Sequence, residues 1–113
     1  MKLSEAEVTR FADMFAALGA DPRLRIMRLL LSAHPGGLVV GEIQEETGIA
    51  NSTLSHHLEK LKIDELVTAE REKAFIRYRA NTAALEELLG FLYAECCTRN
   101  RAVEPRKIAA ICK

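Results

Sequence analysis

Three cysteines near the C-terminal end are the most reactive side chains of this sequence: Cys96 and Cys97 are adjacent, and Cys112 is the penultimate residue. An odd number argues against a framework of disulfides and favours thiols that act as such or bind a soft metal. Thiolates select soft ions, and by extension trivalent arsenic or antimony suits three of them, while a methylated trivalent arsenical needs two. We therefore take Cys96, Cys97 and Cys112 as the candidate ligand set.

The surroundings of the cysteines leave more than one chemistry open. Neighbouring residues on a helix point about 100° apart, so both thiolates of the pair reach one ion only if their rotamers converge or the helix unwinds. Alternatively, the cysteines report oxidants or reactive sulfur, with Cys112 as the better bridging partner because adjacent cysteines bridge with strain. A purely structural role, as a core or interface thiol, is the third reading. Basic side chains that favour thiolates lie nearby: Arg99, Arg101, Arg106 and Lys107.

A second group of polar side chains gathers in the middle of the chain. Leu54, Leu58 and Leu61 are spaced for the buried face of a helix that we expect Asn51 to cap. Its first turn carries small hydroxyl and amide side chains, which let a helix approach base edges, and its backbone N–H groups attract phosphates. The alternative is that these residues serve only as caps. The candidate DNA contacts on this helix are Asn51, Ser52, Thr53, Ser55, His56 and Lys60.

Basic residues follow in two expected strands, 66–69 and 75–79, which flank a charged turn. In the second strand Ile76 and Tyr78 alternate with arginines, as in a half-buried strand. We expect Arg71, Lys73 and Arg77, with Arg79 nearby, to neutralise phosphates at a hairpin whose tip enters the minor groove. The alternative is a solvated turn without a ligand.

The remaining pattern predicts the helices that position these groups. A capping box at 4–7 opens a first helix, Asp21 and Pro22 open a second, and residues 40–47 form a short third helix that ends before Gly48. Asn81 caps a long helix after the hairpin, and residues 105–112 form one more short helix. The apolar faces of the first and last long helices are expected to be Val8, Phe11, Ala12, Phe15 and Leu18, and Leu85, Leu88, Leu89 and Leu92.

Four helices, a hairpin and a long helix predict a mainly α, winged helix-turn-helix fold. Its 113 residues suffice for one domain, which we place at residues 1–113 with a cysteine-containing C-terminal tail. Sixteen basic and sixteen acidic residues give zero net charge, which is compatible with DNA binding if the bases gather on one face. Without an apolar run long enough for a membrane span or a signal peptide, we expect a cytoplasmic protein with no membrane contact.

Three runs in the chain resemble the ArsR/SmtB family of bacterial metal-responsive repressors. They are Phe15–Gly19 continuing through Asp21–Ile26, then Thr53–Leu61, and then Ile76–Arg79. The similarity extends over roughly residues 11–92. It implies a homodimer built on the first and last long helices, which binds double-stranded operator DNA and leaves it when an inducer binds.

The resemblance also locates the sensor by elimination within the family. The stretch 38–43 has no cysteine where arsenic-sensing members carry Cys–Val–Cys, and the last helix lacks the aspartate and histidine set of zinc sensors. The C-terminal cysteines remain, so arsenite or antimonite is the expected inducer, with Cys112 from either subunit. A protein-interaction module that does not bind DNA is a rival function. We expect no enzyme, because the sequence has no phosphate-binding glycine loop and no metal-hydrolase motif.

Overall fold

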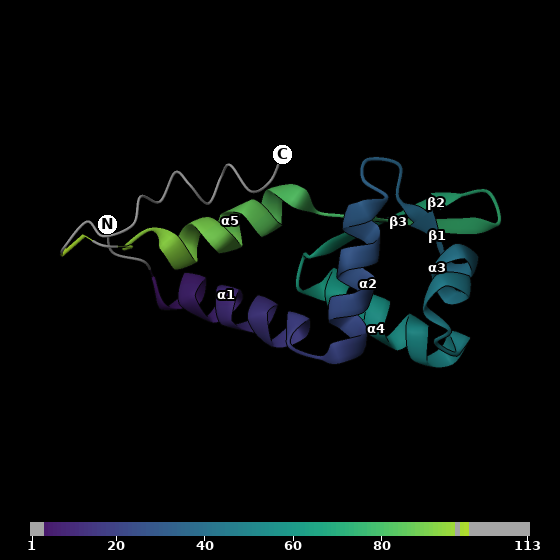
Figure 1. Ribbon diagram of the computed structural model, residues 1–113, viewed down its shortest axis with the longest axis horizontal. Coiled ribbons are helices and arrows are strands. Elements are labelled where there is room, and N and C mark those ends of the chain that lie inside the picture. Colours follow the sequence, from purple (N-terminus) through teal and green to yellow (C-terminus); the bar gives the residue numbers. More distant parts are fainter. Residues whose placement is uncertain (1–3, 97, 100–113) are drawn as a thin grey trace.

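The computed structural model describes residues 4–96, 98 and 99, which form helices around one end of a small antiparallel sheet (Figure 1). Within these residues no helix is long and apolar enough to cross a membrane. The order of elements confirms the expected winged helix-turn-helix with one addition, a short strand before the third helix. The elements are α1 (Glu5–Leu18), α2 (Asp21–Ser32), β1 (Leu38–Val39), α3 (Val40–Thr47), α4 (Asn51–Ile63), β2 (Val67–Glu72), β3 (Phe75–Ala80) and α5 (Thr82–Tyr93).

The core joins all five helices to the base of the sheet. Its centre is a set of side chains with no exposed surface, to which α4 contributes three leucines. Removing such apolar surface from water is the main favourable term in folding, so these contacts fix how each helix is rotated. The fully buried residues include Met14, Ile26, Leu30, Ile43, Leu54, Leu58, Leu61, Leu66 and Leu88.

Helices α1 and α5 lie side by side at the end of the molecule opposite the hairpin (Figure 1). The rings of Phe11 and Phe91 stack with centroids 4.4 Å apart. Beside them the Arg10 guanidinium donates through Nε to Glu65 at 3.0 Å and through both Nη atoms to Glu87. Arg10 thus connects α1 to α5 and to the turn that follows α4.

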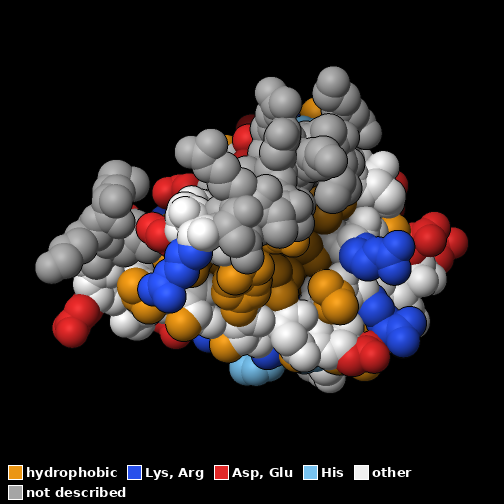
Figure 2. All heavy atoms as spheres, turned by 60° about the vertical axis from the view of Figure 1, so that its left-hand side comes forward, with side chains coloured by type: hydrophobic (Ala, Val, Ile, Leu, Met, Phe, Trp, Pro, Cys, Tyr) orange, Lys and Arg blue, Asp and Glu red, His pale blue; other side chains and the backbone are white. Residues whose placement is uncertain are grey.

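The apolar stripe expected on α1 is divided between the core and the surface. Phe11 is buried together with Met14 and Ala17, whereas Val8 is 46% and Phe15 36% exposed. On α5, Leu88 is buried while Leu92 is 55% exposed. Figure 2, which brings this end of the molecule forward, shows hydrophobic side chains gathered in the middle of the face. One monomer therefore leaves part of the α1–α5 pair unburied.

Strand β1 was not foreseen from the sequence. It pairs with β3 in the sheet order β1-β3-β2, with Leu38 opposite Tyr78 and Val39 opposite Arg77. Two residues are too few for a periodic signal. The strand depends instead on Gly37, whose φ of +72° turns the chain alongside β3.

Two expected helix caps are wrong by one residue. Ala20 and Ala50 are the N-caps of α2 and α4, so Asp21 and Asn51 are the first helical residues. Asp21 forms an ion pair with Arg25 one turn later, at positions i and i+4. The helix dipole also favours a carboxylate in the first turn. The caps expected at Ser4 and Asn81 are confirmed.

Three further expectations are corrected by the structure. The hairpin strands run to Glu72 and from Phe75, so the turn is two residues rather than five. Alternating burial in β3 fails, because Ile76 is exposed while Arg77 and Arg79 are half-buried. Helix α5 ends at Tyr93, so Cys96 lies in a turn beyond it. Cys97, Cys112 and the expected helix at 105–112 lie outside the described residues.

Two glycines with the same left-handed φ of +72° make a matched test of the β1 connection. A methyl group on Gly48 would meet nothing within 4 Å among the described residues, so Gly48→Ala should lower the free energy of unfolding by about 1 kcal/mol. On Gly37 it would overlap the carbonyl oxygen of Tyr78 and lie 2.6 Å from Cγ of Arg79. Gly37→Ala should therefore cost an additional ~1–3 kcal/mol.

Urea unfolding at one fixed protein concentration measures both changes. Gly41→Ala is the control, since Gly41 lies in helix α3 with open space around it. This substitution should slightly raise the free energy of unfolding. Equal losses in Gly37→Ala and Gly48→Ala would mean that the close approach to β3 does not constrain the chain.

Candidate nucleic-acid interface

The turn between α3 and α4 sets the angle between the two helices. Gly48 adopts the left-handed conformation, and its N–H donates to the carbonyl of Gln44 at 2.8 Å. The Thr47 hydroxyl donates to the carbonyl of Ile43 and accepts from the N–H of Ile49. These contacts satisfy backbone groups that the end of a helix leaves open, so the turn is defined locally by its sequence.

Helix α4 presents a polar face to solvent because its apolar face is fully used. Leu54, Leu58 and Leu61 are buried without residual exposure. The residues predicted as contacts in the first two turns are all exposed: Asn51, Ser52, Thr53, Ser55 and His56. Five of the six candidates on α4 thus share one accessible face.

The N-terminal end of α4 has backbone N–H groups available for an anion. Among the described residues no side chain caps this end, because the N-cap is Ala50. Unpaired N–H groups and the helix dipole both favour negative charge at such an end. With the short side chains around it, this end can approach a phosphate closely.

The sixth candidate on α4, Lys60, is engaged with the protein itself. Its Nζ lies 3.1 Å from Oδ2 of Asp64, an ion-pair distance without hydrogen-bond geometry. The pair joins positions i and i+4 at the C-terminal end of the helix. Lys60 is thus less available to a phosphate than the residues of the first turns.

His57 links the recognition segment to the preceding helices. Arg23 donates through Nε to the carbonyl of Ala17 at 2.7 Å, and its Nη1 lies 3.4 Å from Nδ1 of His57. Partial burial, and then the charges of Arg23 and His56, lower the pKa of His57. The imidazole is therefore neutral near pH 7 and accepts from Arg23, as expected for a packed histidine rather than a ligand.

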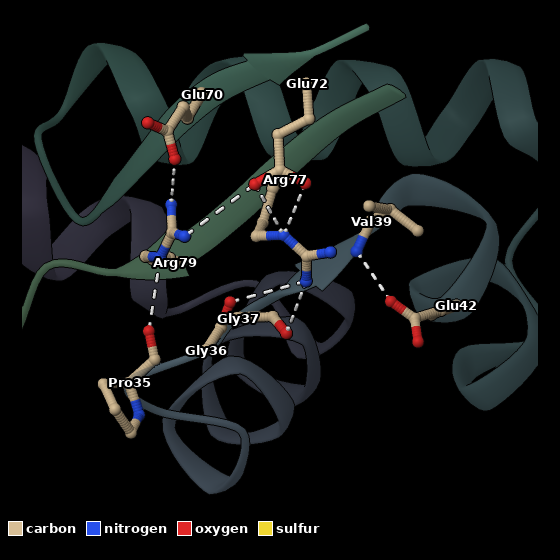
Figure 3. Close-up of polar contacts among 9 residues, drawn as sticks. All are labelled: Pro35, Gly36, Gly37, Val39, Glu42, Glu70, Glu72, Arg77 and Arg79. Atoms are coloured by element: carbon tan, nitrogen blue, oxygen red, sulfur yellow. Dashed lines mark hydrogen bonds and ion pairs between the residues drawn. The ribbon is translucent and has the colours of Figure 1, made fainter. Parts of the chain in front are cut away.

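The hairpin next to α4 is held by a network of arginines (Figure 3). Arg77 donates through Nε to both oxygens of Glu72 at 3.0 Å, and its Nη1 lies 3.3–3.4 Å from the carbonyls of Gly36 and Gly37. Arg79 pairs with Glu70 at 2.7 Å and also donates to the carbonyl of Pro35. The wing is thereby tied to the loop that precedes β1.

These pairs decide which of the wing's charges are open to a partner. Arg77, a predicted phosphate contact, is largely occupied by Glu72 and the loop carbonyls. Arg71 and Lys73 are exposed, and among the described residues neither has an ion-pair partner. The accessible positive charge of the wing is therefore concentrated at its tip.

Two residues, one behind α4 and one at the wing, were not singled out as functional from the sequence. Arg23 escaped notice because its two contacts come from α1 and α4, which no local pattern brings together. Phe75 was assigned only to a strand, yet 63% of it is exposed beside the wing turn. An aromatic residue next to a two-residue turn would have been a signal, had the strand bounds been known.

The structure brings only part of the cysteine set into view. Cys96 is half-buried, and its N–H donates to the carbonyl of Tyr93 at 2.8 Å. Within residues 4–96, 98 and 99 no group of three histidine, cysteine or acidic side chains is arranged to hold a metal ion. The other two predicted ligands lie outside these residues, so the three-thiolate site stays a prediction.

Comparison with known proteins matches residues 21–69 to the family described as "Bacterial regulatory protein, arsR family". The chain is 31% identical over 80 residues to the transcriptional repressor SdpR of Bacillus subtilis, covering 71% of this chain and 86% of SdpR.

Two solved structures are also similar. HlyU of Vibrio cholerae has a TM-score of 0.63 at 31% identity, covering 80% of this chain and 99% of HlyU. The homodimeric winged helix-turn-helix DNA-binding domain of Mb0332 from Mycobacterium bovis has a TM-score of 0.64 at 28% identity, covering 92% and 99%.

The environment of His57 predicts a loss of stability in mild acid. Its pKa is lowered in the folded protein, whereas the unfolded chain takes up the proton near the ordinary value of about 6.5. The contribution to stability is therefore complete above about pH 6.5 and is lost as the pH falls toward the lowered pKa. Thermal melts from pH 7.5 to 5.5 should show a falling Tm, and His57→Gln should flatten this slope. The exposed neighbour gives the control, since His56→Gln should keep most of the slope; equal slopes in the two variants would contradict the assignment.

Proposed function

Because the chain belongs to the arsR family of bacterial regulatory proteins, we propose that it is a homodimeric repressor that binds operator DNA and is released by a thiophilic inducer. The similar protein SdpR is named as a transcriptional repressor. The inducer we propose is trivalent arsenic or antimony on cysteine thiolates, and the regulated step is occupancy of the operator.

The exposed polar face of α4 is the observation that carries the DNA-binding part of the proposal. A helix that enters the major groove needs short polar side chains in its first turns and a rigid attachment on its other side. Ser52, Ser55 and His56 supply the first requirement, and the three buried leucines supply the second. The cationic tip of the wing lies on the same half of the molecule, where it can neutralise phosphates.

The unburied part of the α1–α5 pair supports the homodimer. Val8 and Phe15 are two helical turns apart on one face of α1, and Leu92 extends the apolar surface on α5. A second copy related by a twofold axis would cover this surface with the same residues. Such a dimer places two α4 helices for half-sites about one turn of DNA, roughly 34 Å, apart. The similar Mb0332 domain is likewise homodimeric.

Two substitutions separate dimer formation from DNA reading. Phe15→Glu places a charge in the proposed interface and should give a monomer with operator affinity at least about 100-fold lower, because each half-site then binds alone. Ser55→Ala should leave the dimer intact and lower affinity for the operator about tenfold more than affinity for unrelated DNA. Sedimentation equilibrium and fluorescence anisotropy measure the two effects. A dimer that survives Phe15→Glu would place the interface elsewhere, and unchanged discrimination in Ser55→Ala would remove this residue from base reading.

The position of Cys96 supports the inducer part of the proposal. Cys96 follows α5 in a turn, so its direction is not set by the geometry of a regular helix. A soft trivalent ion would be held by Cys96 and Cys97, with Cys112 of either subunit as the third thiolate. Ligation beyond the end of a dimer helix would change how the two subunits meet, and with it the spacing of the two α4 helices.

Arsenite titrated into the reduced protein on labelled promoter DNA tests the inducer. We expect arsenite to lower the anisotropy, Cys96→Ser to abolish this response without changing DNA affinity, and Thr98→Ser to behave as the unchanged protein. By linkage, the operator must weaken arsenite binding by the same factor. Equal arsenite affinity with and without DNA would sink the proposal, and release by an oxidant alone would assign the cysteines to redox sensing.

A further inference from the structure

An exposed aromatic ring stands at the tip of the wing. Phe75 is the first residue of β3, directly after the turn Lys73–Ala74, and it pairs across the hairpin with Glu72. It is 63% exposed, although burying an aromatic side chain is among the larger stabilising contributions a residue makes. In its exposed position the ring adds little to the stability of the fold. It would be buried only against the surface of a partner.

The charges around Phe75 indicate what kind of partner that is. The carboxylate opposite the ring, Glu72, accepts from Arg77, and Glu70 is paired with Arg79. Neither of the wing's acids is therefore left to repel an anion. Lys73 lies in the turn next to Phe75, and Arg71 lies on β2 opposite Ile76, on the other face of the hairpin. Both are exposed and have no ion-pair partner among the described residues. An apolar side chain at a tip with two open cations matches the minor groove of DNA, where phosphates line both walls of an apolar stack of bases.

The tip is also held rigidly enough to act as a wedge. The strands pair along their full length up to Glu72 and Phe75, so only two residues form the turn. The base of β3 is paired on its other side with β1, and Arg77 reaches the carbonyls of Gly36 and Gly37. A preorganised tip loses little conformational freedom on binding.

We propose that Phe75 inserts at a base step in the minor groove beside each half-site and bends the operator, while Lys73 and Arg71 bind the flanking phosphates. The inference rests on the proposed operator-binding function and adds a second mode of recognition to it. Partial unstacking is easiest at flexible pyrimidine–purine steps, so the wing would select DNA by deformability while α4 reads base edges.

Bending and unstacking are both measurable on the operator. A fragment with a donor and an acceptor dye at its two ends reports the bend by energy transfer. A series of fragments with single 2-aminopurines reports local unstacking as increased fluorescence. The variants are Phe75→Ala, Phe75→Leu and Ile76→Ala, the last a neighbour on the opposite face of the same strand, 38% exposed.

We expect the unchanged protein to raise energy transfer and to brighten one 2-aminopurine position in each half-site. Phe75→Ala should lose both signals and about tenfold in affinity, with the salt dependence of binding unchanged. Phe75→Leu, which keeps an apolar wedge, should retain most of the bend, and Ile76→Ala should retain it fully. Lys73→Gly, which suits the positive φ at this position, should instead lower the salt slope by about one unit.

The outcomes separate this inference from the function on which it rests. Tight operator binding without bending or unstacking would overturn the wedge and leave the repressor intact. The same bend in Phe75→Ala would also overturn it. Absence of any salt-dependent DNA binding would overturn both and favour a winged helix that binds proteins.

Discussion

The complete burial of Leu54, Leu58 and Leu61 is the constraint on which the proposed DNA-facing surface depends. The three leucines fix the rotation of α4 about its own axis, and this rotation decides that Ser52, Ser55 and His56 face outward. Turning the helix by one residue would expose leucine and bury hydroxyl groups without partners, and both changes oppose folding. The proposed contacts with bases thus rely on an apolar interaction that never touches DNA.

A protein with zero net charge can bind an anionic partner when its acidic side chains are paired internally and some basic ones are left exposed. Glu70 and Glu72 are paired with Arg79 and Arg77, and the four side chains hold the wing instead of contributing a field of either sign. Arg71 and Lys73 are left to act at the tip. Binding of this kind depends on where unpaired charge is presented, and a sum over the chain does not measure that.

Helix periodicity and turn residues were enough to predict the helices and their order, because α4 and α5 carry local signals in their leucines and in Gly48 and Asn81. The outward side of α4 followed from the same spacing. What could not be predicted depends on distant partners. The short strand β1 exists through its pairing with β3, the half-burial of Arg77 through Glu72 and the loop carbonyls, and the contact of Arg23 with His57 through the packing of three helices. The division of the α1 stripe between core and surface needs α5 beside it.

Strand β1 has a mechanical consequence. It is paired with β3 on one side and continues at Val40 directly into α3, so the wing and the helix-turn-helix are joined through one short stretch of backbone. Each subunit then moves as one unit, in which α4 and the wing keep a constant separation. In the proposed dimer, adjustment to operators of different half-site spacing would occur where α1 and α5 of the two subunits meet. The hinge of the proposed dimer would lie between the subunits and not within them.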